Sequence, residues 1–270
     1  MAGICQLSAL PVSIAEHMAT TLLREYPRFV RAHDGLWRVR EAAGPRWRAD
    51  SDFDLLSDLS FAVVDLEATG GSATSGDRIT EVGIVIVRGG EIERSYERLV
   101  NPQRAIPSFV ARLTRITWEL VRTEPTFRDL SGEIVDQLAG HVFVAHNANF
   151  DWRFLNAELS RVNGQVLTGR RLCTVRLARC LLPQLRSRSL DGLSHHYGVE
   201  IPPENRHRAG GDALAAAKCL IRLMEDARGR GCERWSDLED LLASRRIGGR
   251  RRRKRRPSAM PGPVSKDTTA

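Results

Sequence analysis

Five side chains in three short segments have the types and the order expected of a site for phosphodiester hydrolysis. Asp65 and Glu67 flank a leucine, Asp151 stands in a later segment, and His207 precedes Asp212 by five residues. Carboxylate oxygens are the ligands that Mg²⁺ and Mn²⁺ prefer, and a histidine of near-neutral pKa can take a proton from water. Four carboxylates and one histidine are therefore the donor set expected of a site with two divalent ions.

Each acidic segment also has an ordinary structural explanation. The run Phe61–Asp65 predicts a buried strand, and side chains two apart on a strand share a face, so Asp65 and Glu67 can converge on one ion. Two acids at a strand end also occur by chance. Asp151 opens a predicted helix, where the helix dipole favours an acid, and Asp212 at the start of another suits an N-cap. The inference therefore rests on the ordered set and not on one segment.

The elements that must position these residues predict a mixed α/β sheet. The turn Gly89-Gly90 between the second and third strands indicates an antiparallel meander. Strands first, then alternating helices and strands, are typical of a mixed sheet flanked by helices. The predicted strands are 61–65, 79–88, 91–100 and 141–145, and the predicted helical regions are 107–138, 149–162, 174–182, 190–197, 212–224 and 235–244.

The chain divides into a central α/β domain with additions at both ends. Its 270 residues provide one domain of ordinary size plus these additions, and 42% apolar residues are enough for a packed core. We place an accessory segment at 1–57, the central domain at 58–228, a C-terminal helix at 229–247 and a disordered basic tail at 248–270.

The accessory segment contains signals for a helix and a hairpin. Apolar residues have helical spacing over Val12–Glu25, and residues 28–31 and 36–39 alternate around Asp34-Gly35. A helix followed by a basic hairpin resembles the last helix and wing of a winged-helix DNA-binding module, although the segment is short for that fold. The alternative is a cap packed on the central domain. Residues 43–57 indicate a linker.

The positive charge of the chain is concentrated at one end. Residues 250–256 are seven consecutive Arg and Lys, and removing them from the formal net charge of +8 leaves +1. Such a block repels itself and attracts polyanions, which predicts a disordered tail. Three roles stay open for it: phosphate contact with a nucleic-acid substrate, a solubilising end, or a nuclear targeting signal.

Composition argues against membrane and secreted classes. No apolar run approaches the roughly 20 residues of a spanning helix, and the N-terminus lacks the pattern of a secretory signal. The five cysteines include no C-x-x-C pair and are odd in number, which predicts neither a disulfide framework nor a zinc site. We expect a soluble, cytoplasmic protein without a membrane partner.

The three acidic segments resemble the exonuclease motifs of the DEDDh (DnaQ-like) 3′–5′ exonuclease family, and most of all the epsilon proofreading subunit of bacterial DNA polymerase III. They read Asp-Leu-Glu-Ala-Thr-Gly at 65–70, His-Asn-Ala-Asn-Phe-Asp at 146–151 and His-Arg-Ala-x-x-Asp-Ala at 207–213. The resemblance covers about residues 60–225 and implies an RNase H-like fold. Further matching segments are 106–107, 113–117, 172–179 and 189–193.

The resemblance also implies a role for each residue. Asp65 would bridge two Mg²⁺ or Mn²⁺ ions, Glu67 and Asp212 would complete one ion site, Asp151 would act nearby, partly through water, and His207 would be the general base. Two ions about 3.5–4 Å apart activate the attacking water and stabilise the leaving oxygen. The substrate-binding residues that it implies are Ala68, Thr69, Asn147 and Phe150.

Two residues depart from the family pattern without removing a catalytic group. Arg115 stands where relatives usually have glycine, in a loop expected near the substrate groove, and Gly210 stands where a larger apolar residue is common. These departures bear on substrate preference or loop conformation.

The expected function is metal-dependent 3′–5′ hydrolysis of DNA 3′ ends to nucleoside 5′-monophosphates, in proofreading or repair. The expected partners are single-stranded DNA 3′ ends, with RNA as a further substrate, and DNA polymerase III or a repair complex. The tail has no clear clamp-binding pattern, which favours a stand-alone or repair enzyme. The alternatives are an exoribonuclease of the same superfamily and a nonenzymatic nucleic-acid-binding module, and the five intact site residues argue against the second.

Overall fold

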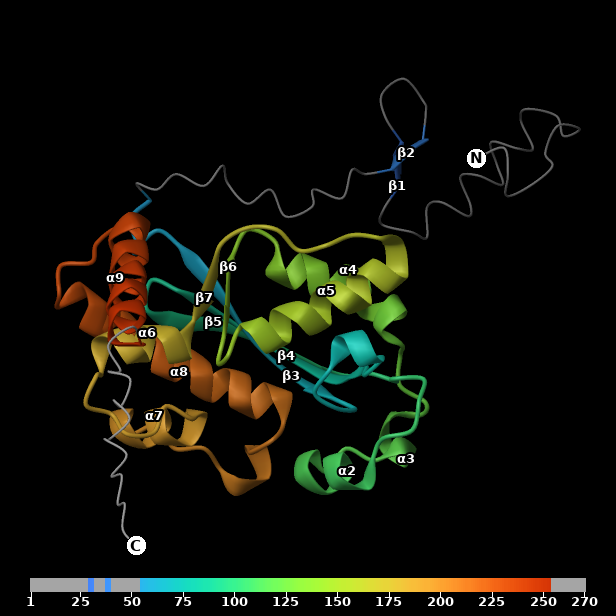
Figure 1. Ribbon diagram of the computed structural model, residues 1–270. Helices are drawn as coiled ribbons and strands as arrows, with labels where there is room; N and C mark the ends of the chain where they lie inside the picture. The colour runs from blue at the N-terminus through green and yellow to red at the C-terminus, as the bar shows by residue number, and fades with distance from the viewer. Residues whose placement is uncertain (1–28, 32–36, 40–53, 254–270) are drawn as a thin grey trace, which may run out of the picture.

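A mixed five-stranded sheet lies at the centre of the protein (Figure 1). The computed structural model describes residues 29–31, 37–39 and 54–253. The strand order is β5-β4-β3-β6-β7, with β4 antiparallel to both of its neighbours and β6 parallel to both of its own. The strands of this sheet are β3 (Ser60–Ala68), β4 (Ile79–Arg88), β5 (Glu91–Leu99), β6 (Val142–Ala145) and β7 (Arg171–Cys173).

The predicted meander and the mixed sheet flanked by helices are confirmed. Strand β7 was not predicted. It has three residues, of which one is buried, so the sequence shows no alternation there that could be recognised.

Two helices, α4 (Phe127–Leu138) and α5 (Asn149–Asn163), cover one face of the sheet (Figure 1). Thr126 and Asp129 form a capping box that starts α4. The buried residues of α4 recur at helical spacing: Phe127, Leu130, Ile134 and Leu138. They pack with the even-numbered residues of β3, such as Val64 and Leu66.

The other face of the sheet is covered mainly by α8 (Ala209–Arg228), with α6, α7 and α9 around it. Small residues such as Ala213, Ala216 and Ala217 let α8 lie close to β3 and β4. The odd-numbered residues of β3, such as Val63, face this layer. The other helices of this layer are α6 (Thr174–Leu181), α7 (Leu190–Tyr197) and α9 (Trp235–Arg253).

The remaining elements are short. The region 107–138, which was predicted to be mostly helical, contains α2 (Ser108–Thr114) and α3 (Trp118–Val121) before α4. Two single-turn 3₁₀ helices, η1 (Ala73–Ser75) and η2 (Pro203–Asn205), lie in the loops that precede β4 and α8. Within the described part of the chain, no helix combines the length and the hydropathy that a membrane-spanning segment needs.

The hairpin of the accessory segment is present as β1 (Phe29–Arg31) paired antiparallel with β2 (Trp37–Val39). The predicted helix 12–25, and hence the winged-helix interpretation, lies outside the described residues. The predicted linker 43–57 is corrected at its end. Leu56 is buried, its amide donates to Glu233 O at 2.9 Å, and Asp54 forms an ion pair with Arg170 at 2.9 Å.

Within the C-terminal segment 229–247, the sequence predicts a helix over residues 235–244. Helix α9 begins at Trp235, as predicted, and its range extends to Arg253. Residues 254–270 of the predicted tail lie outside the described residues.

Candidate active site

The first two acids lie at the carboxyl end of β3, on the face that α8 covers. They alternate with Leu66 and Ala68, which pack into the core on the opposite face. Asp65 is paired with Gly83 across the sheet, and Glu67 is paired with Glu81. The ladder is irregular between Glu67 and Ala68, so regular pairing ends where the acids lie. The predicted shared face of Asp65 and Glu67 is therefore present.

Helix α8 brings Asp212 to this end of the sheet because Gly83 lets it approach. A Cβ atom at Gly83 would overlap the carbonyl group of Ala209, the first residue of α8. Without that contact the first turn of α8 would lie further from β4. Asp212 lies in this first turn and is buried. Gly83 is thus a positioning residue that sequence reasoning missed.

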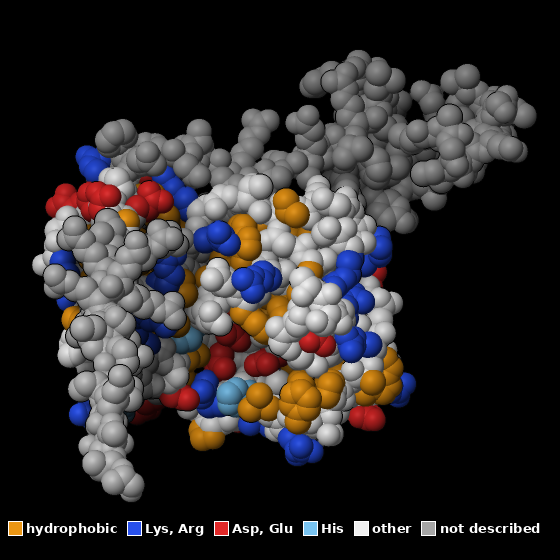
Figure 2. Space-filling view, viewed as in Figure 1, with side chains coloured by type: hydrophobic (Ala, Val, Ile, Leu, Met, Phe, Trp, Pro, Cys, Tyr) orange, Lys and Arg blue, Asp and Glu red, His pale blue; other side chains and the backbone are white. Residues whose placement is uncertain are grey.

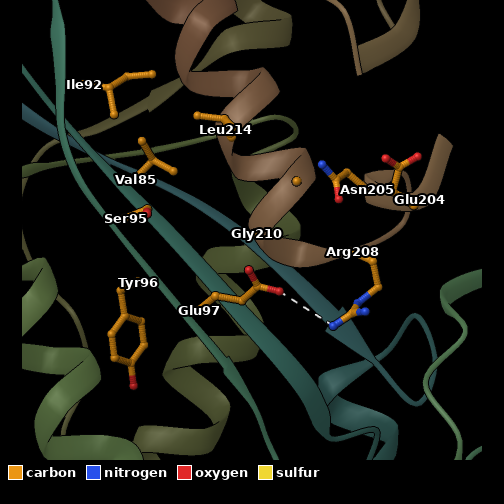
Figure 3. Close-up of a pocket in the computed structure, with 11 residues that line it drawn as sticks. Val85, Ile92, Ser95, Tyr96, Glu97, Glu204, Asn205, Arg208, Gly210 and Leu214 are labelled. Atoms are coloured by element: carbon orange, nitrogen blue, oxygen red, sulfur yellow. Dashed lines mark ion pairs between the residues drawn. The ribbon is translucent and has the colours of Figure 1, made fainter. Parts of the chain in front are cut away.

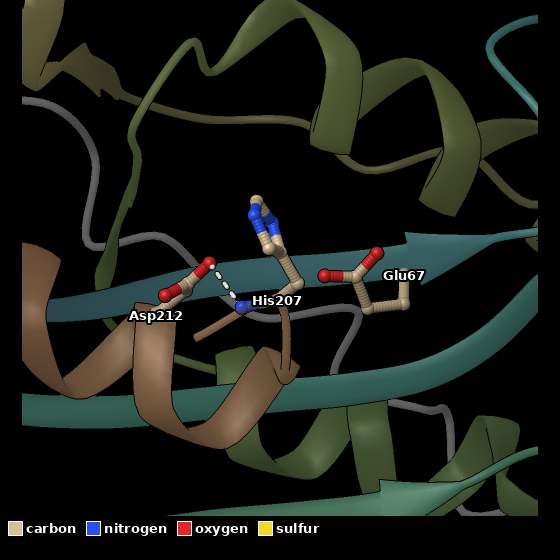
Figure 4. A group of neighbouring side chains, drawn as sticks. All are labelled: Glu67, His207 and Asp212. Carbon is tan, nitrogen blue, oxygen red and sulfur yellow. Dashed lines mark hydrogen bonds between the residues drawn. The ribbon is translucent and has the colours of Figure 1, made fainter. Parts of the chain in front are cut away.

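His207 lies in the loop immediately before α8 and has a left-handed backbone conformation, with φ of 56°. Its amide donates to Asp212 Oδ2 at 3.3 Å. Ligand atoms of Glu67, His207 and Asp212 all lie within 4.8 Å of one another. Figure 4 shows Glu67 and Asp212 on either side of His207, from β3 and α8. Segments 140 positions apart in the chain thus meet in one small cluster.

Asp151 joins this cluster from the opposite layer. Strand β6 runs parallel to β3, with Ala145 paired to Val64, so both strands end at the same edge of the sheet. The turn that follows contains Asn147 with φ of 77°, and α5 begins at Asn149. Asp151 lies in the first turn of α5 and is 3% exposed. The acid therefore points inward, although the helix dipole alone would also favour an acid here.

The electrostatics show that the four acids share one poorly compensated site. Burial raises the pKa of Asp65 well above its ordinary value, and the negative charges of Asp151, Glu67 and Asp212 raise it further. Burial raises the pKa of Glu67 to about 7, with a further contribution from Asp212. Burial also raises the pKa of Asp151 to about 8, although hydrogen bonds to backbone groups oppose the shift. A divalent cation is the partner that would compensate these charges.

Asp212 differs from the other acids because it already has a cationic partner. Arg206 Nη1 lies 2.6 Å from Asp212 Oδ1, and Nη2 of the same side chain lies 2.7 Å from Asp191 Oδ2 in α7. Burial raises the pKa of Asp212, and the Arg206 guanidinium lowers it. Arg206 therefore orients one acid of the cluster and joins α7 to the start of α8. Sequence reasoning missed it because its partners are set by the packing of the two helices.

A second ion pair, also missed by sequence reasoning, fixes the start of α8. Glu81 in β4 is fully buried, and Arg208 Nε donates to both of its carboxylate oxygens at 3.0 and 3.1 Å. The amide of Ala209 donates to Glu81 Oε2 at 2.7 Å. A buried carboxylate with a bidentate arginine and a helix N-terminal amide is a strong, directional anchor.

The substrate-binding residues predicted from the resemblance lie around the cluster. Ala68 and Thr69 are buried where β3 ends, and the Thr69 hydroxyl accepts from the Arg78 amide at 3.1 Å. The side chain of Thr69 therefore holds the following loop. Asn147 is exposed, whereas Phe150 is half-buried, with its ring centroid 4.7 Å from that of Phe154.

The surface around the acids carries both apolar and basic side chains. Figure 2 shows acidic side chains in a hollow, with arginine or lysine and a histidine at its rim and hydrophobic side chains over α2 and α3. The exposed apolar residues of these two helices are Phe109, Leu113, Trp118 and Leu120. Exposed apolar surface next to an acidic site suits the bases of an unpaired strand.

A separate pocket of about 240 Å³ lies between β4, β5 and α8 (Figure 3). Its lining includes Tyr96, Glu97, Arg208 and Leu214, and Arg208 is paired there with Glu97 at 3.6 Å. Gly210 lies at this pocket, and a Cβ atom there would overlap the carboxylate of Glu97. None of the five candidate catalytic residues lines it. The departure from the family pattern at Gly210 therefore affects the packing at this pocket and not the acidic cluster itself.

The donor set fits divalent metal ions. Oxygen ligands are available from Asp65, Glu67, Asp151 and Asp212, whose pKa values are raised chiefly by burial. Hard cations such as Mg²⁺ and Mn²⁺ bind such carboxylates. His207 adds a nitrogen that can accept a proton beside them. The arrangement therefore suits hydrolysis of a phosphodiester.

Comparison with known proteins agrees with this geometry. The family model of the RNase T exonucleases matches residues 62–220. The chain is 32% identical over 168 residues to the 3′-5′ exonuclease DinG of Bacillus subtilis. This alignment covers 62% of this chain and 18% of that protein. The chain is also 36% identical over 178 residues to a DNA polymerase III subunit epsilon-like protein of Rhodobacter capsulatus. That alignment covers 65% of this chain and 25% of the relative.

A solved exonuclease structure is also similar to this chain. The structure of exonuclease X in complex with 5′ overhanging duplex DNA has a TM-score of 0.55 and 28% sequence identity, and the alignment covers 67% of this chain and 99% of that one. The chain spans about a third or less of the length of the curated relatives it matches. The motifs, the sheet and the family match agree, and the chain belongs to the RNase T exonuclease family.

Proposed function

We propose that the protein is a metal-dependent 3′–5′ exonuclease that releases nucleoside 5′-monophosphates from the 3′ ends of single-stranded DNA. The observation that carries this proposal is the convergence of Asp65, Glu67, Asp151 and Asp212, from three separate elements, beside His207. Burying carboxylates beside one another carries an electrostatic cost, and a metal-binding function accounts for it.

Each of the five residues has a distinct part in this reaction. Asp65, Glu67 and Asp212 would hold the Mg²⁺ or Mn²⁺ ions, with Asp65 shared between them, and Asp151 would act nearby, partly through water. When bound, such ions lower the pKa of a water molecule and stabilise the leaving oxygen. His207 takes the proton from the attacking water, because its ring lies beside the carboxylates that would hold the metal.

The substrate is held by the groups around the cluster. The backbone at Ala68 and Thr69 contacts the terminal 3′-OH, and Asn147 and Phe150 border the pocket of the last nucleotide. The exposed apolar side chains of α2 and α3 contact the unpaired bases that precede it. Stacking on such side chains depends little on base identity, so we expect degradation without marked sequence preference.

The biological setting that we propose is DNA repair or proofreading in the cytoplasm. Relatives include a DNA polymerase III subunit epsilon-like protein and polymerases of the DNA polymerase III PolC type, which supports a setting in DNA metabolism. DNA polymerase III or a repair complex is the partner class.

The test is digestion of matched single-stranded DNA and RNA, labelled at either the 5′ or the 3′ end, with Mg²⁺ or Mn²⁺, with Asp65→Ala as the inactive control. Stepwise shortening of 5′-labelled DNA with RNA spared supports the proposal. Preference for RNA would make the protein an exoribonuclease of the same superfamily. No cleavage of either substrate by the wild-type chain would favour a nonenzymatic nucleic-acid-binding module.

A further inference from the structure

The turn after α2 is tied to the loop that carries His207 by a single side chain. Arg115 follows the last residue of α2, and its guanidinium donates to three backbone carbonyl groups. Nη2 donates to Glu204 O and to Arg206 O at 2.7 Å each, and Nη1 donates to Pro203 O at 3.3 Å. All three acceptors lie in the four residues immediately before His207.

The backbone of Arg115 is in a conformation that costs an arginine free energy. Its φ is 61° and its ψ is 13°, in the left-handed region where glycine is favoured. Glycine would satisfy this turn without strain but has no side chain to reach the loop. The three charge-assisted hydrogen bonds are what an arginine adds at this position.

The other end of the same loop is fixed to the acidic cluster. Arg206 forms an ion pair with Asp212 at 2.6 Å, and the amide of His207 donates to Asp212. His207 itself has a positive φ of 56°, which a β-carbon makes unfavourable and which only surrounding contacts can maintain. The loop is thus held between Arg115 on one side and Asp212 on the other.

We propose that Arg115 is a positioning residue that fixes the loop of residues 203–206 and so holds the His207 imidazole beside the acidic cluster. This inference rests on the proposed function, in which His207 is the general base. Arg115 does not touch the reacting atoms in this arrangement. It acts through the backbone of the loop, and it links the apolar surface of α2 and α3 to the catalytic histidine.

The tether is tested first without substrate, by hydrogen exchange on the full-length protein. Arg115→Gly removes the three hydrogen bonds and keeps the backbone conformation without strain, so the fold should persist. We expect the amides of residues 204–207 to exchange roughly tenfold faster or more in Arg115→Gly. Arg112→Ala removes the same charge from the exposed last turn of α2 and should leave this exchange unchanged. Equal exchange in the wild-type protein and Arg115→Gly overturns the proposal.

Steady-state kinetics on single-stranded DNA then test the role in catalysis. We expect Arg115→Gly to lower kcat about 10- to 100-fold, since a misplaced general base loses much of its effect, with a smaller change in KM. Arg115→Lys keeps a donor and the charge, and it should recover part of kcat. A normal kcat with a raised KM would instead show a substrate contact and would overturn the positioning role.

A double-mutant cycle separates an effect through His207 from a general loss of structure. In a His207→Ala background, Arg115→Gly should lower kcat little further, because the group that it positions is absent. Fully additive losses would contradict the proposal. If the wild-type chain shows no nuclease activity, the proposed function fails and the catalytic role of Arg115 falls with it, whereas the exchange experiment still decides whether the tether exists.

Discussion

At the scale of single residues, the site combines a shared negative charge with a strained backbone. Burial and four neighbouring acids all raise the pKa of Asp65 well above its ordinary value. His207, Asn147 and Arg115 are among the non-glycine residues of the described chain with positive φ, and all three border the site. Strain of this kind concentrates where function fixes the geometry.

Loss of one carboxylate should abolish hydrolysis and leave the fold in place. Asp65→Ala and Asp212→Ala each remove an oxygen ligand from the proposed metal site, and Asp65→Ala also relieves buried repulsion. We expect no detectable nuclease activity and an unchanged circular dichroism spectrum. His207→Ala should lower kcat about 10²- to 10⁴-fold, the usual contribution of a general base, with metal binding largely kept. Near-wild-type activity of Asp65→Ala would reject the site.

The raised pKa values predict that the metal-free protein becomes less stable as pH rises. The pKa of Glu67 moves from 4.5 to about 7 and that of Asp151 from 3.8 to about 8 in the folded chain. Between about pH 4.5 and pH 8, the folded state therefore holds protons that the unfolded state has lost. The free energy of unfolding falls with rising pH over that window.

Thermal unfolding with a chelator, at intervals from pH 5 to pH 8, measures this effect. We expect Tm to fall with pH in the wild-type protein and to fall less steeply in Asp151→Asn, because one of the proton-binding groups is gone. Adding Mg²⁺ or Mn²⁺ should raise Tm most at the higher pH, where the carboxylates are ionised. Identical pH slopes for the two proteins would contradict the raised pKa of Asp151.

At the scale of elements, the site depends on how closely α8 approaches the sheet. Gly83 in β4 leaves room for the carbonyl group of Ala209, and the buried pair of Glu81 and Arg208 fixes the helix start in that position. Arg206 then links α8 to α7 through Asp191. The position of Asp212 is therefore set by contacts that all act on the first turn of one helix.

Gly83→Ala should reduce both stability and activity by moving this helix. The added Cβ meets backbone at Ala209, which cannot rotate away, so we expect a loss of about 1–3 kcal/mol in the free energy of unfolding. Nuclease activity should fall more steeply than stability, because Asp212 shifts with the helix.

Gly132→Ala is the matched control. Gly132 lies in α4 with no atom within 4 Å of the added Cβ, and this variant should gain up to about 1 kcal/mol from helix propensity. Urea unfolding and single-turnover assays measure both effects. A Gly83→Ala variant as active as Gly132→Ala would show that α8 tolerates displacement.

At the scale of the whole molecule, charge is separated between the site and the end of the chain. The active site is an acidic hollow beside an apolar surface, whereas residues 250–256 hold seven positive charges. The rest of the chain is close to neutral, so this block dominates long-range attraction of polyanions. A phosphate-binding tail would raise the local concentration of substrate without entering the reaction.

Replacing the basic residues 250–256 with glutamine should weaken substrate binding at low salt only. Glutamine keeps the length and the helix propensity of this segment while removing its charge. We expect KM to rise at low ionic strength, kcat at saturating DNA to stay the same, and the salt dependence of binding to become shallower by about 0.7 per lost phosphate contact. Fluorescence anisotropy with Asp65→Ala as the parent protein measures binding without cleavage. An unchanged salt slope would exclude phosphate contact by the tail.

The sequence by itself determined the residue types, their order and most of the elements. Alternation along β3 placed Asp65 and Glu67 on one face, and the glycine turn at 89–90 predicted the meander that the sheet contains. Strand β7 was not predicted because three residues are too few to show an alternating pattern of apolar and polar side chains. The C-terminal end of α9 was not predicted because its last turns consist mainly of charged residues and lack regularly spaced apolar residues.

Only the tertiary structure decided how these parts meet. The pairing of Glu81 with Arg208, the tether from Arg115 and the space at Gly83 each join residues far apart in the chain, 88 positions in the case of Arg115 and Pro203. No local propensity encodes such contacts, because they depend on the register of the sheet and on the seating of α8. The raised pKa values have the same origin, since burial and neighbouring charge exist only once the three segments have come together.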